Sequence, residues 1–597
     1  MHRRRARRAV TSALTSRGEA APNGLKWCGR RPLREALDAR VWSAGYAFVD
    51  GDPDQLLLDD AIGAHLARAR DVASAASRLD GCFAAVIDRA QETVLVTDRY
   101  GSVPLYFRAP LARPAVASDD PWAVVATLSR PPALDAVAVL DMLRLGYVAG
   151  ERTLIENVRT MPPASVTRVS DAHVVTEQYW RFSYIDGRDD PAMYEKRLDQ
   201  CMDALAARID ALCDGQGREA VLMLSGGVDT RAVAALLATR SRSSVRCISY
   251  GPADDPDART GREIADAVGF RFEHAPISVD AFNSQLCEPS SFKAAIREVG
   301  ITTRFTCGTG ARFSSVADDG VVLTGHTGFL SSALHRMNWG VYGKAGARRM
   351  TYARHYTYER SEVLVPRSVR VDYDALRYTS LDETLASYDP CVDPLGEMHR
   401  WNEEQRQRNL VLMEYRAYEQ RAPWMMPLGA HDVVDLFLTL PYALRLDQRL
   451  YKQMVQQMCT GRAEPLAHIS RVGGRLSADN RVYRRYRTID RLQPASGAVL
   501  TRALPLAKRY GQRQRHTPPL RYGPNPLRHW FLTDGQFRTD VLDRVEAISV
   551  DVLRPEAIRA ALLDGRSGEW VFQLLLAGAL TVQGVADEAT RVWQRER

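Results

Sequence analysis

One stretch decides the fold of this chain: AVLMLSGGVDTR, residues 220–231. Its first five residues are apolar and form a candidate buried strand. A helical pattern of apolar positions follows the glycines, at Val233, Leu236 and Leu237. Two adjacent glycines let backbone N–H groups approach a ligand closely, and the first turn of a helix adds a partial positive charge. The stretch therefore predicts an anion site between a strand and a helix.

The carboxylate of Asp229 would repel a bare anion at this turn. A divalent cation such as Mg²⁺, placed between the carboxylate and a triphosphate, satisfies both charges. For Ser225–Gly227 alone, the competing interpretation is a tight strand-to-helix turn that binds nothing. The strand, Asp229, Thr230 and the helix in register favour a nucleotide site.

This stretch resembles the SGGxDS pyrophosphate loop of the N-type ATP pyrophosphatases, and its surroundings resemble the asparagine synthetase family. Such enzymes cleave ATP between the α and β phosphates and make an acyl-adenylate. The resemblance implies that the chain binds ATP and Mg²⁺, with Asp229 as the metal ligand. The nucleotide-binding residues that it implies are Leu224, Ser225, Gly226, Gly227, Asp229, Thr230, Tyr250, Gly251, Gly325 and Arg471.

Two further segments resemble the family's catalytic motifs: VVLTGHTGF at residues 321–329 and EQRAP at residues 419–423. By this resemblance His326 takes the place of a catalytic tyrosine of the β-lactam synthetases, and Glu419 is its partner. The resemblance implies a His326–Glu419 dyad that deprotonates an attacking amine, because imidazole titrates near neutrality. In the alternative, His326 only caps a turn and Glu419 only pairs with Arg421.

Two departures from the family pattern affect the metal and phosphate sites. Phe329 stands where the family has a second Mg²⁺-binding Asp, and a phenylalanine cannot coordinate a metal. A nearby carboxylate could substitute: Asp318, Asp319 or Asp432. Otherwise activity is weak or lost. The family's late lysine has no clear match, and Arg471 or Arg475 could replace it because a guanidinium binds phosphate well.

The sequence predicts α/β and α+β architecture in three parts. Residues 1–25 form a basic tail that we expect to be disordered. Residues 26–188 form a degenerate, inactive glutaminase-like (class II amidotransferase-like) domain of layered antiparallel strands, whose segments 79–84 and 98–106 resemble the family's glutaminase domain. Residues 189–597 form a synthetase domain with a parallel sheet and a helical extension. The strands expected in the first third are 45–49, 81–88, 93–97 and 165–169.

The glutaminase reaction is expected to be absent. In the family it needs a cysteine at the mature N-terminus, and here Met1 is followed by His2. Cys28-Gly29 matches such a start only superficially, and an incidental or buried thiol is the favoured interpretation. Without this reaction, the amine that forms the amide belongs to the substrate itself.

Composition sets wider limits. A chain of 597 residues exceeds the size of one hydrophobic core, and 45% hydrophobic with 25% charged residues is the balance of a soluble protein. Apolar runs fall short of the roughly 18–20 residues that cross a bilayer, so no membrane partner is expected. Scattered cysteines without a CxxC pair indicate reduced thiols in the cytoplasm. The net charge of +8 includes a basic stretch at 471–528, interpreted as a solvated surface, a surface for an acidic partner or, least favoured, a nucleic-acid site.

The leading hypothesis is an ATP-dependent carbon–nitrogen ligase that closes a macrolactam ring in a precursor peptide, as lasso-peptide cyclases do. A protease or leader-peptide-processing protein is a further expected partner. The alternatives are an enzyme of the same class acting on a small molecule, a non-catalytic scaffold because of Phe329, and a nucleic-acid-binding protein with an ATP loop.

Overall fold

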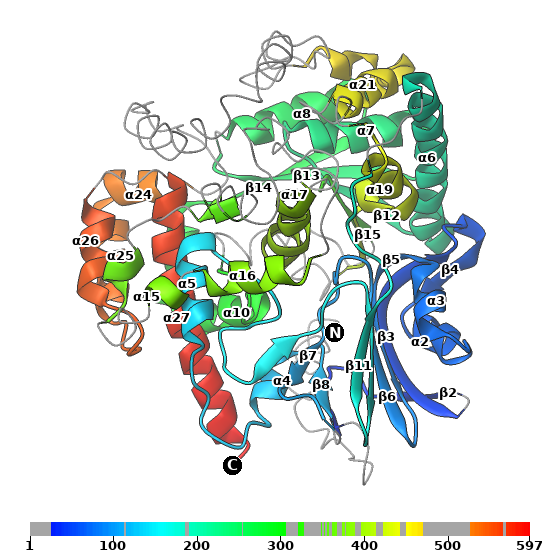
Figure 1. Ribbon diagram of the computed structural model, residues 1–597. Coiled ribbons are helices and arrows are strands. Elements are labelled where there is room, and N and C mark those ends of the chain that lie inside the picture. The colour runs from blue at the N-terminus through cyan, green and yellow to red at the C-terminus, as the bar shows by residue number, and fades with distance from the viewer. Residues whose placement is uncertain are drawn as a thin grey trace, which may run out of the picture.

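The computed structural model describes residues 26–36, 38–112, 115–185, 190–253, 255–305, 320–326, 348, 351–352, 355–356, 361–366, 373–376, 378–388, 396–413, 422–441, 444, 449–469, 526–564 and 569–597. Figure 1 shows two large sheets, an N-terminal one at the lower right and a second one above it, with a group of helices at the left. No helix in these ranges is both long and apolar enough to span a bilayer.

The N-terminal sheet is antiparallel and has the strand order β11-β10-β6-β5-β3-β2, with β4 paired to β3. All four strands expected in this region are confirmed. Two helices, α2 (Asp60–Ala67) and α3 (Val72–Ser77), pack on the sheet through apolar side chains. The strands are β2 (Arg34–Ala36), β3 (Ala39–Val49), β4 (Leu56–Leu58), β5 (Leu79–Asp88), β6 (Glu92–Thr97), β10 (Ser165–Ser170) and β11 (Val174–Gln178).

A smaller four-stranded sheet lies beside it, in the order β1-β8-β7-β9. Its strands are β1 (Lys26–Trp27), β7 (Tyr106–Arg108), β8 (Val116–Ser118) and β9 (Val158–Thr160). Trp27 packs against Trp42 of β3, with ring centroids 4.7 Å apart, and so joins the two sheets into one layered unit.

The second large sheet is entirely parallel, as predicted, in the order β14-β13-β12-β15-β16. From β12 the chain first builds outward on one side through β13 and β14, and later on the other side through β15 and β16. The order therefore reverses between β12 and β15, which is where ligands bind in open α/β sheets. The strands are β12 (Glu219–Met223), β13 (Val245–Gly251), β14 (Arg271–Pro276), β15 (Gly320–Thr324) and β16 (Trp424–Met425).

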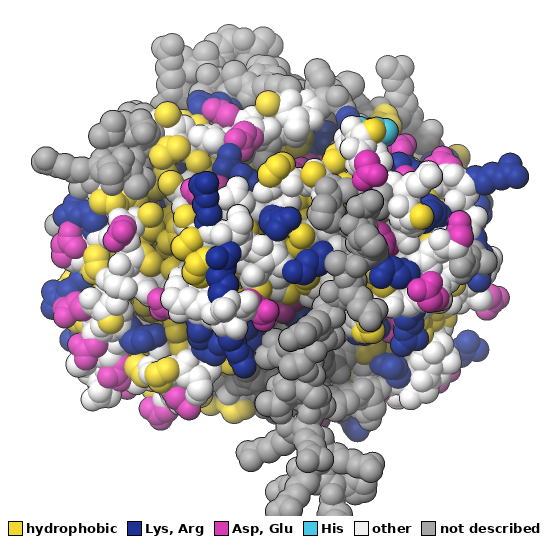
Figure 2. Space-filling model, turned by 90° about the horizontal axis from the view of Figure 1, so that it is seen from below, with side chains coloured by type: hydrophobic (Ala, Val, Ile, Leu, Met, Phe, Trp, Pro, Cys, Tyr) yellow, Lys and Arg dark blue, Asp and Glu magenta, His cyan; other side chains and the backbone are white. Residues whose placement is uncertain are grey.

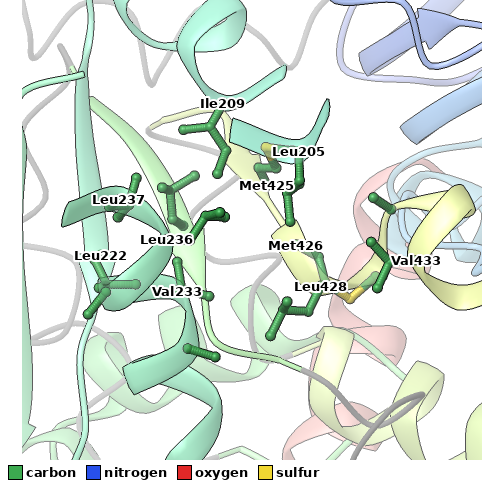
Figure 3. Close-up of a cluster of buried hydrophobic side chains, with 14 of the residues drawn as sticks. Leu205, Ile209, Leu222, Val233, Leu236, Leu237, Met425, Met426, Leu428 and Val433 are labelled. Carbon is green, nitrogen blue, oxygen red and sulfur yellow. The ribbon is translucent and has the colours of Figure 1, made fainter. Parts of the chain in front are cut away.

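Helices on both faces cover this sheet. Figure 3 shows apolar side chains of α6, β12, α7, β16 and α19 meeting in one core, among them Leu222, Leu236, Met426 and Val433. This core holds the end of β12 and the start of α7 in place. The helices are α6 (Pro191–Leu212), α7 (Val228–Arg240), α8 (Pro256–Val268), α19 (His431–Leu438) and α21 (Arg449–Met458).

The helices at the left of Figure 1 share one core with residues of the N-terminal third. Helix α5 (Ala136–Leu145) packs directly on α27 (Glu569–Arg595). The approach is close, because a Cβ added to Gly578 would lie 3.0 Å from the Met142 carbonyl oxygen. The other helices of this group are α9 (Val279–Cys287), α10 (Pro289–Val299), α24 (Leu527–Thr533), α25 (Gly535–Glu546) and α26 (Pro555–Leu563).

One predicted helix has a different form. The sequence pattern predicts a regular helix over 401–420, but α17 (Gly396–Trp401) continues as a π-helix, η6 (Asn402–Leu412). Residues 414–421 lie outside the described ranges. The remaining described elements are η2 (Pro53–Gln55), α4 (Pro121–Val125), η3 (Asp214–Gln216), η5 (Ser361–Leu364), α15 (Tyr373–Leu376), α16 (Thr379–Ala386), η7 (Pro427–Gly429) and η9 (Gly461–Ala467).

A buried ion cluster fixes the N-terminal sheet to the parallel-sheet domain. Arg208 of α6 donates to Asp80 of β5 at 2.5 Å and to both oxygens of Asp432 in α19 at 2.8 and 2.7 Å. Nearby, Arg99 pairs with Asp435 at 2.7 Å. The side chains of Arg208 and Asp80 are only 2% and 10% exposed, so this ion pair is shielded from water.

Candidate functional site

Three neighbouring parallel strands deliver the predicted nucleotide residues to one edge of the sheet. Met223 pairs with Ile248 of β13 on one side and with Thr324 of β15 on the other. The segments that follow these positions are therefore adjacent: Leu224 to Gly227, Tyr250-Gly251, and Gly325-His326. Their meeting point is the reversal between β12 and β15, where an open α/β sheet binds its ligands.

The loop between β12 and α7 is held by its own side chains. The Thr230 hydroxyl donates to the Ser225 carbonyl at 2.8 Å, and the Gly227 N–H donates to Ser225 Oγ at 3.2 Å. From behind, the Ser249 hydroxyl donates to the Leu224 carbonyl. Within the described residues no side chain caps α7, so the N–H groups of its first turn keep their capacity to bind a ligand.

Two glycines allow close packing at this loop. A Cβ on Gly226 would lie 2.9 Å from Thr260 Cβ, and a Cβ on Gly325 would lie 2.3 Å from Thr230 Cγ2 and 2.7 Å from the Thr230 amide nitrogen. The backbone after β15 therefore lies directly against the first turn of α7. Gly251 has φ +142, where a side chain would collide with Asp255.

We expect the substitution Gly325→Ala to displace the first turn of α7, since the added methyl group has no space beside the Thr230 backbone. A displacement of binding groups by about 1 Å can weaken their interactions by up to about 100-fold. We therefore expect affinity for MgATP to fall between about 10- and 100-fold. The measurement is MgATP titration by calorimetry. The matched control is Gly535→Ala, because nothing lies within 4 Å of a Cβ there. Equal effects of the two variants would contradict this packing.

The donor set fits a magnesium nucleotide. Asp229 stands in the first turn of α7, and its carboxylate accepts a hydrogen bond of 2.7 Å from the Tyr451 hydroxyl, which orients it. A second carboxylate is close, because Asp257 Oδ1 would lie 3.2 Å from a Cβ on Gly226. Carboxylate oxygens beside an anion-binding helix terminus are suitable for Mg²⁺ with phosphate. Among the described residues, no cluster of three or more His, Cys, Asp or Glu forms a self-contained metal site.

Arg231 places a cation beneath the loop between β12 and α7, which the sequence motif alone does not indicate. It is 2% exposed, and it donates to the Gly226 carbonyl at 3.5 Å and to the Leu466 carbonyl at 3.3 Å. Burial lowers the pKa of this guanidinium, yet an arginine keeps its charge in proteins. A buried positive charge under the loop between β12 and α7 favours an anion above it. Its position directly after Asp229-Thr230 was the available signal.

Two family models match the chain. The first, described as a glutamine amidotransferase domain, matches residues 68–180, and the second, described as asparagine synthase, matches residues 210–328. The second match covers the loop of Ser225–Gly227, Asp229 and the segment through Gly325-His326. The two matches, in this order along the chain, support the resemblance to the asparagine synthetase family.

Matches of the chain to individual proteins are weaker. The glutamine phosphoribosylpyrophosphate amidotransferase from B. subtilis, complexed with ADP and GMP, has 13% identity and a TM-score of 0.17, over 51% of this chain and 60% of that one. A structure described as the allosteric regulatory enzyme of purine biosynthesis has the same identity and TM-score, over 51% and 58%. The chain thus spans less than two thirds of each, and we draw nothing from these likenesses. No curated protein sequence matches the chain.

His326 lies at the sheet edge as the family motif implies, in an environment that the sequence did not reveal. Its Nε2 is shielded from solvent. Burial and the nearby Arg406 cation lower the pKa of His326 to about 3, and the neighbouring Gln407 offsets this shift in part. The imidazole is therefore neutral at pH 7 and a weak proton acceptor. Its assignment as the general base stays a prediction.

Other residues of the predicted site lie outside the described ranges. These are Glu419, Arg471 and Phe329, together with Asp318, Asp319 and Arg475. The third carboxylate considered as a replacement at Phe329, Asp432, is described. Both of its oxygens accept from Arg208 in the ion cluster between the domains.

Cys28 does not have the properties of a reactive thiol. Its sulfur lies 3.8 Å from the Lys26 carbonyl oxygen, and burial raises the pKa of the Cys28 thiol. A nucleophilic cysteine needs the opposite shift, because the thiolate is the reactive form.

Charge on the surface is mixed where it can be seen. On the face shown in Figure 2, Lys and Arg side chains are interspersed with Asp and Glu. Most of the basic stretch 471–528 lies outside the described ranges, which include only 526–528 of it. The acidic-partner and nucleic-acid interpretations of this stretch stay predictions.

Proposed function

We propose that this chain is an ATP-dependent carbon–nitrogen ligase that adenylates a carboxylate and then joins it to an amine of the same peptide. A carboxylate oxygen attacks the α-phosphorus of ATP and pyrophosphate leaves. The amine then attacks the acyl carbon, AMP leaves, and an amide forms. The supporting observation is the loop of Ser225–Gly227, which joins β12 to α7, a helix that no described side chain caps, at the reversal of the sheet order.

Each described residue at the loop has a part in this proposal. The first-turn N–H groups of α7 and the buried Arg231 would hold the phosphates, and Asp229 would hold Mg²⁺ with Tyr451 orienting it. Bound Mg²⁺ would supply neutralisation of phosphate charge as the bond to the α-phosphorus breaks. Gly325 sets how closely the strand after β15 approaches this turn.

The amine is proposed to come from the substrate rather than from glutamine. Cys28, the cysteine that could suggest glutamine hydrolysis, has a thiol with a raised pKa. In a peptide that carries both reacting groups, as in lasso-peptide maturation, the amine and the acyl-adenylate react within one molecule, so the barrier is lower. Holding an amine against an acyl-adenylate is worth about 7–11 kcal/mol of the barrier.

The test is pyrophosphate release from ATP and Mg²⁺, with and without synthetic peptides that carry a free N-terminal amine and an internal aspartate or glutamate. We expect release that depends on the peptide, together with a product lighter by one water. Release with small amino acids alone would instead support a small-molecule ligase. If MgATP binds but neither substrate class triggers pyrophosphate release, the result would support the alternative of a non-catalytic scaffold.

The role of His326 can be measured separately. We expect His326→Ala to leave pyrophosphate release within about twofold and to slow amide formation about 5- to 10-fold, the equivalent of one neutral hydrogen bond. A neutral imidazole with a pKa of about 3 can accept that bond but holds a proton weakly. The measurement compares single-turnover rates of pyrophosphate and amide formation. An unchanged amide rate would remove His326 from the amine site.

A further inference from the structure

The π-helix η6 carries a run of polar residues through the interior of the protein. Its sequence NEEQRQRN covers residues 402–409, and Arg406 is the only one of these that is not buried. Burying polar groups is costly unless they have partners, so such a helix needs a reason. π-helical segments frequently occur at functional sites.

One side of η6 holds the N-terminal domain. Arg408 donates to the Met161 carbonyl, and Gln405 accepts from the Gly150 N–H at 2.7 Å. Glu404 forms a buried ion pair of 2.7 Å with Arg400. These contacts account for the side chains at 404, 405 and 408 as structural.

Another side of η6 lies at the sheet edge. Arg406 acts electrostatically on both His326 and Glu403, and Gln407 neighbours the His326 imidazole. Because His326 follows β15, which pairs with β12, this side of the helix lies beside the nucleotide loop. Arg406 therefore links Glu403 to two other titratable groups on which it also acts, His326 after β15 and Tyr147 after α5.

Glu403 is the residue of this side whose bonding is incomplete. It is 1% exposed, and its Oε1 accepts from Asn402 Nδ2 at 2.8 Å. Its Oε2 is shielded from water and receives no hydrogen bond from the residues that the structure describes. A buried carboxyl oxygen without a donor is costly, and a substrate amine would supply the donor.

Resting on the function proposed above, we propose that Glu403 binds the acceptor amine and takes a proton from it as the amide forms. The amine nitrogen forms its bond to the acyl carbon with its lone pair. The bond from this carbon to the AMP oxygen breaks, and AMP leaves with the electron pair. Of the two protons that an ammonium group loses in becoming an amide, one passes to Glu403 Oε2 and the other to water.

The chemistry of Glu403 selects a class of amine. Burial raises the pKa of Glu403 to about 8, and the hydrogen bond from Asn402 and the charge of Arg406 limit the rise. The α-amine of a peptide has a pKa of about 7.7–8.0, whereas a lysine side chain has about 10.4. Proton transfer to Glu403 is therefore nearly balanced for an N-terminal amine and uphill for lysine, so the predicted nucleophile is the N-terminus of the peptide.

The test uses the full chain with the substitution Glu403→Gln, ATP, Mg²⁺ and the peptides described above. We expect amide formation to fall at least about 100-fold while pyrophosphate release persists. Hydroxylamine, a neutral nucleophile at pH 7, should still yield hydroxamate. The wild-type amide rate should rise with pH up to about 8, because the ionised carboxylate is the base, and this rise should disappear in the variant.

The matched control is Glu404→Gln, which changes a buried carboxylate of the same helix that is paired with Arg400. It should lower the melting temperature yet keep the pH profile of amide formation. In wild type, the stability associated with Glu403 is present at low pH and lost as pH rises toward about 8, and Glu403→Gln should remove this decline. That measurement reports the buried carboxyl without any substrate.

The outcomes separate the two proposals. An N-terminally acetylated peptide with lysine as its only amine should give no amide. Normal amide formation by Glu403→Gln, or a loss above about 100-fold in His326→Ala with its pyrophosphate release intact, would overturn the role of Glu403 and leave the ligase function standing. Absence of both pyrophosphate and hydroxamate in wild type would overturn the ligase function and this inference together.

Discussion

Replacing Asp229 with alanine should lower peptide-dependent pyrophosphate release about 1,000-fold. Removing a residue that hydrogen-bonds to a metal ligand already lowers metal affinity or activity about 10- to 100-fold. Removing a single neutral hydrogen-bond donor to a charge that develops in the transition state lowers the rate about 100- to 1,000-fold. Asp229 is proposed to bind the metal directly, from the first turn of α7, and Tyr451 holds its carboxylate at 2.7 Å.

The experiment has two matched variants. Asp266→Ala removes an exposed carboxylate of α8 and should behave as wild type. Tyr451→Phe removes only the orienting hydrogen bond, so it should lower the rate of pyrophosphate release about 5- to 10-fold. Release rates are measured over a series of Mg²⁺ concentrations. If Asp229→Ala kept wild-type rates at low Mg²⁺, the metal would be bound elsewhere.

Replacing Arg208 with methionine should destabilise the protein by about 3–5 kcal/mol, the cost of leaving buried charges without their partner. Asp80 and Asp432 would both lose the guanidinium that bridges them, at 2.5 and 2.7 Å. The side chains of Arg208 and Asp80 are only 2% and 10% exposed, so water cannot replace the interaction that Asp80 loses, whereas Asp432 is 36% exposed and contributes less. The measurement is the midpoint of urea unfolding together with the melting temperature.

The control for this prediction is Arg240→Met. Arg240 also bridges two aspartates, but Asp199 and Asp203 are 65% and 69% exposed, so the cost should stay below about 1 kcal/mol. Adding Asp80→Asn and Asp432→Asn to Arg208→Met should recover part of the loss, because the uncompensated charges are then gone. Equal shifts for Arg208→Met and Arg240→Met would mean that the cluster between the domains contributes little.

The strand, loop and helix of residues 219–240 could be predicted because their signals are local. An apolar strand, two glycines and a helical pattern stand within residues 220–237, and each restricts its own neighbourhood. The same holds for the four N-terminal strands, where alternation and turn residues suffice. The convergence of Tyr250-Gly251 and Gly325-His326 on this loop then follows from parallel pairing of adjacent strands.

The buried polar helix, the ion cluster and the pKa of His326 could not be predicted, because they depend on contacts between residues far apart in the sequence. Residues 402–409 have the composition of a solvated helix, and all of them except Arg406 are buried because separate parts of the chain enclose them. Arg208 lies 128 positions from Asp80 and 224 from Asp432, beyond any local pattern. His326 stands within a local motif, but its lowered pKa comes from burial first and then from Arg406, 80 residues further along the chain.

The packing of α5 on α27 has a consequence for biosynthesis. Helix α5 leaves the ribosome about 420 residues before its cover, Glu569–Arg595, is translated. At about 5–20 residues per second, the apolar face of α5 waits for tens of seconds before it can be buried. A premature stop codon shortly before Glu569 would leave the apolar face of α5 without its α27 cover.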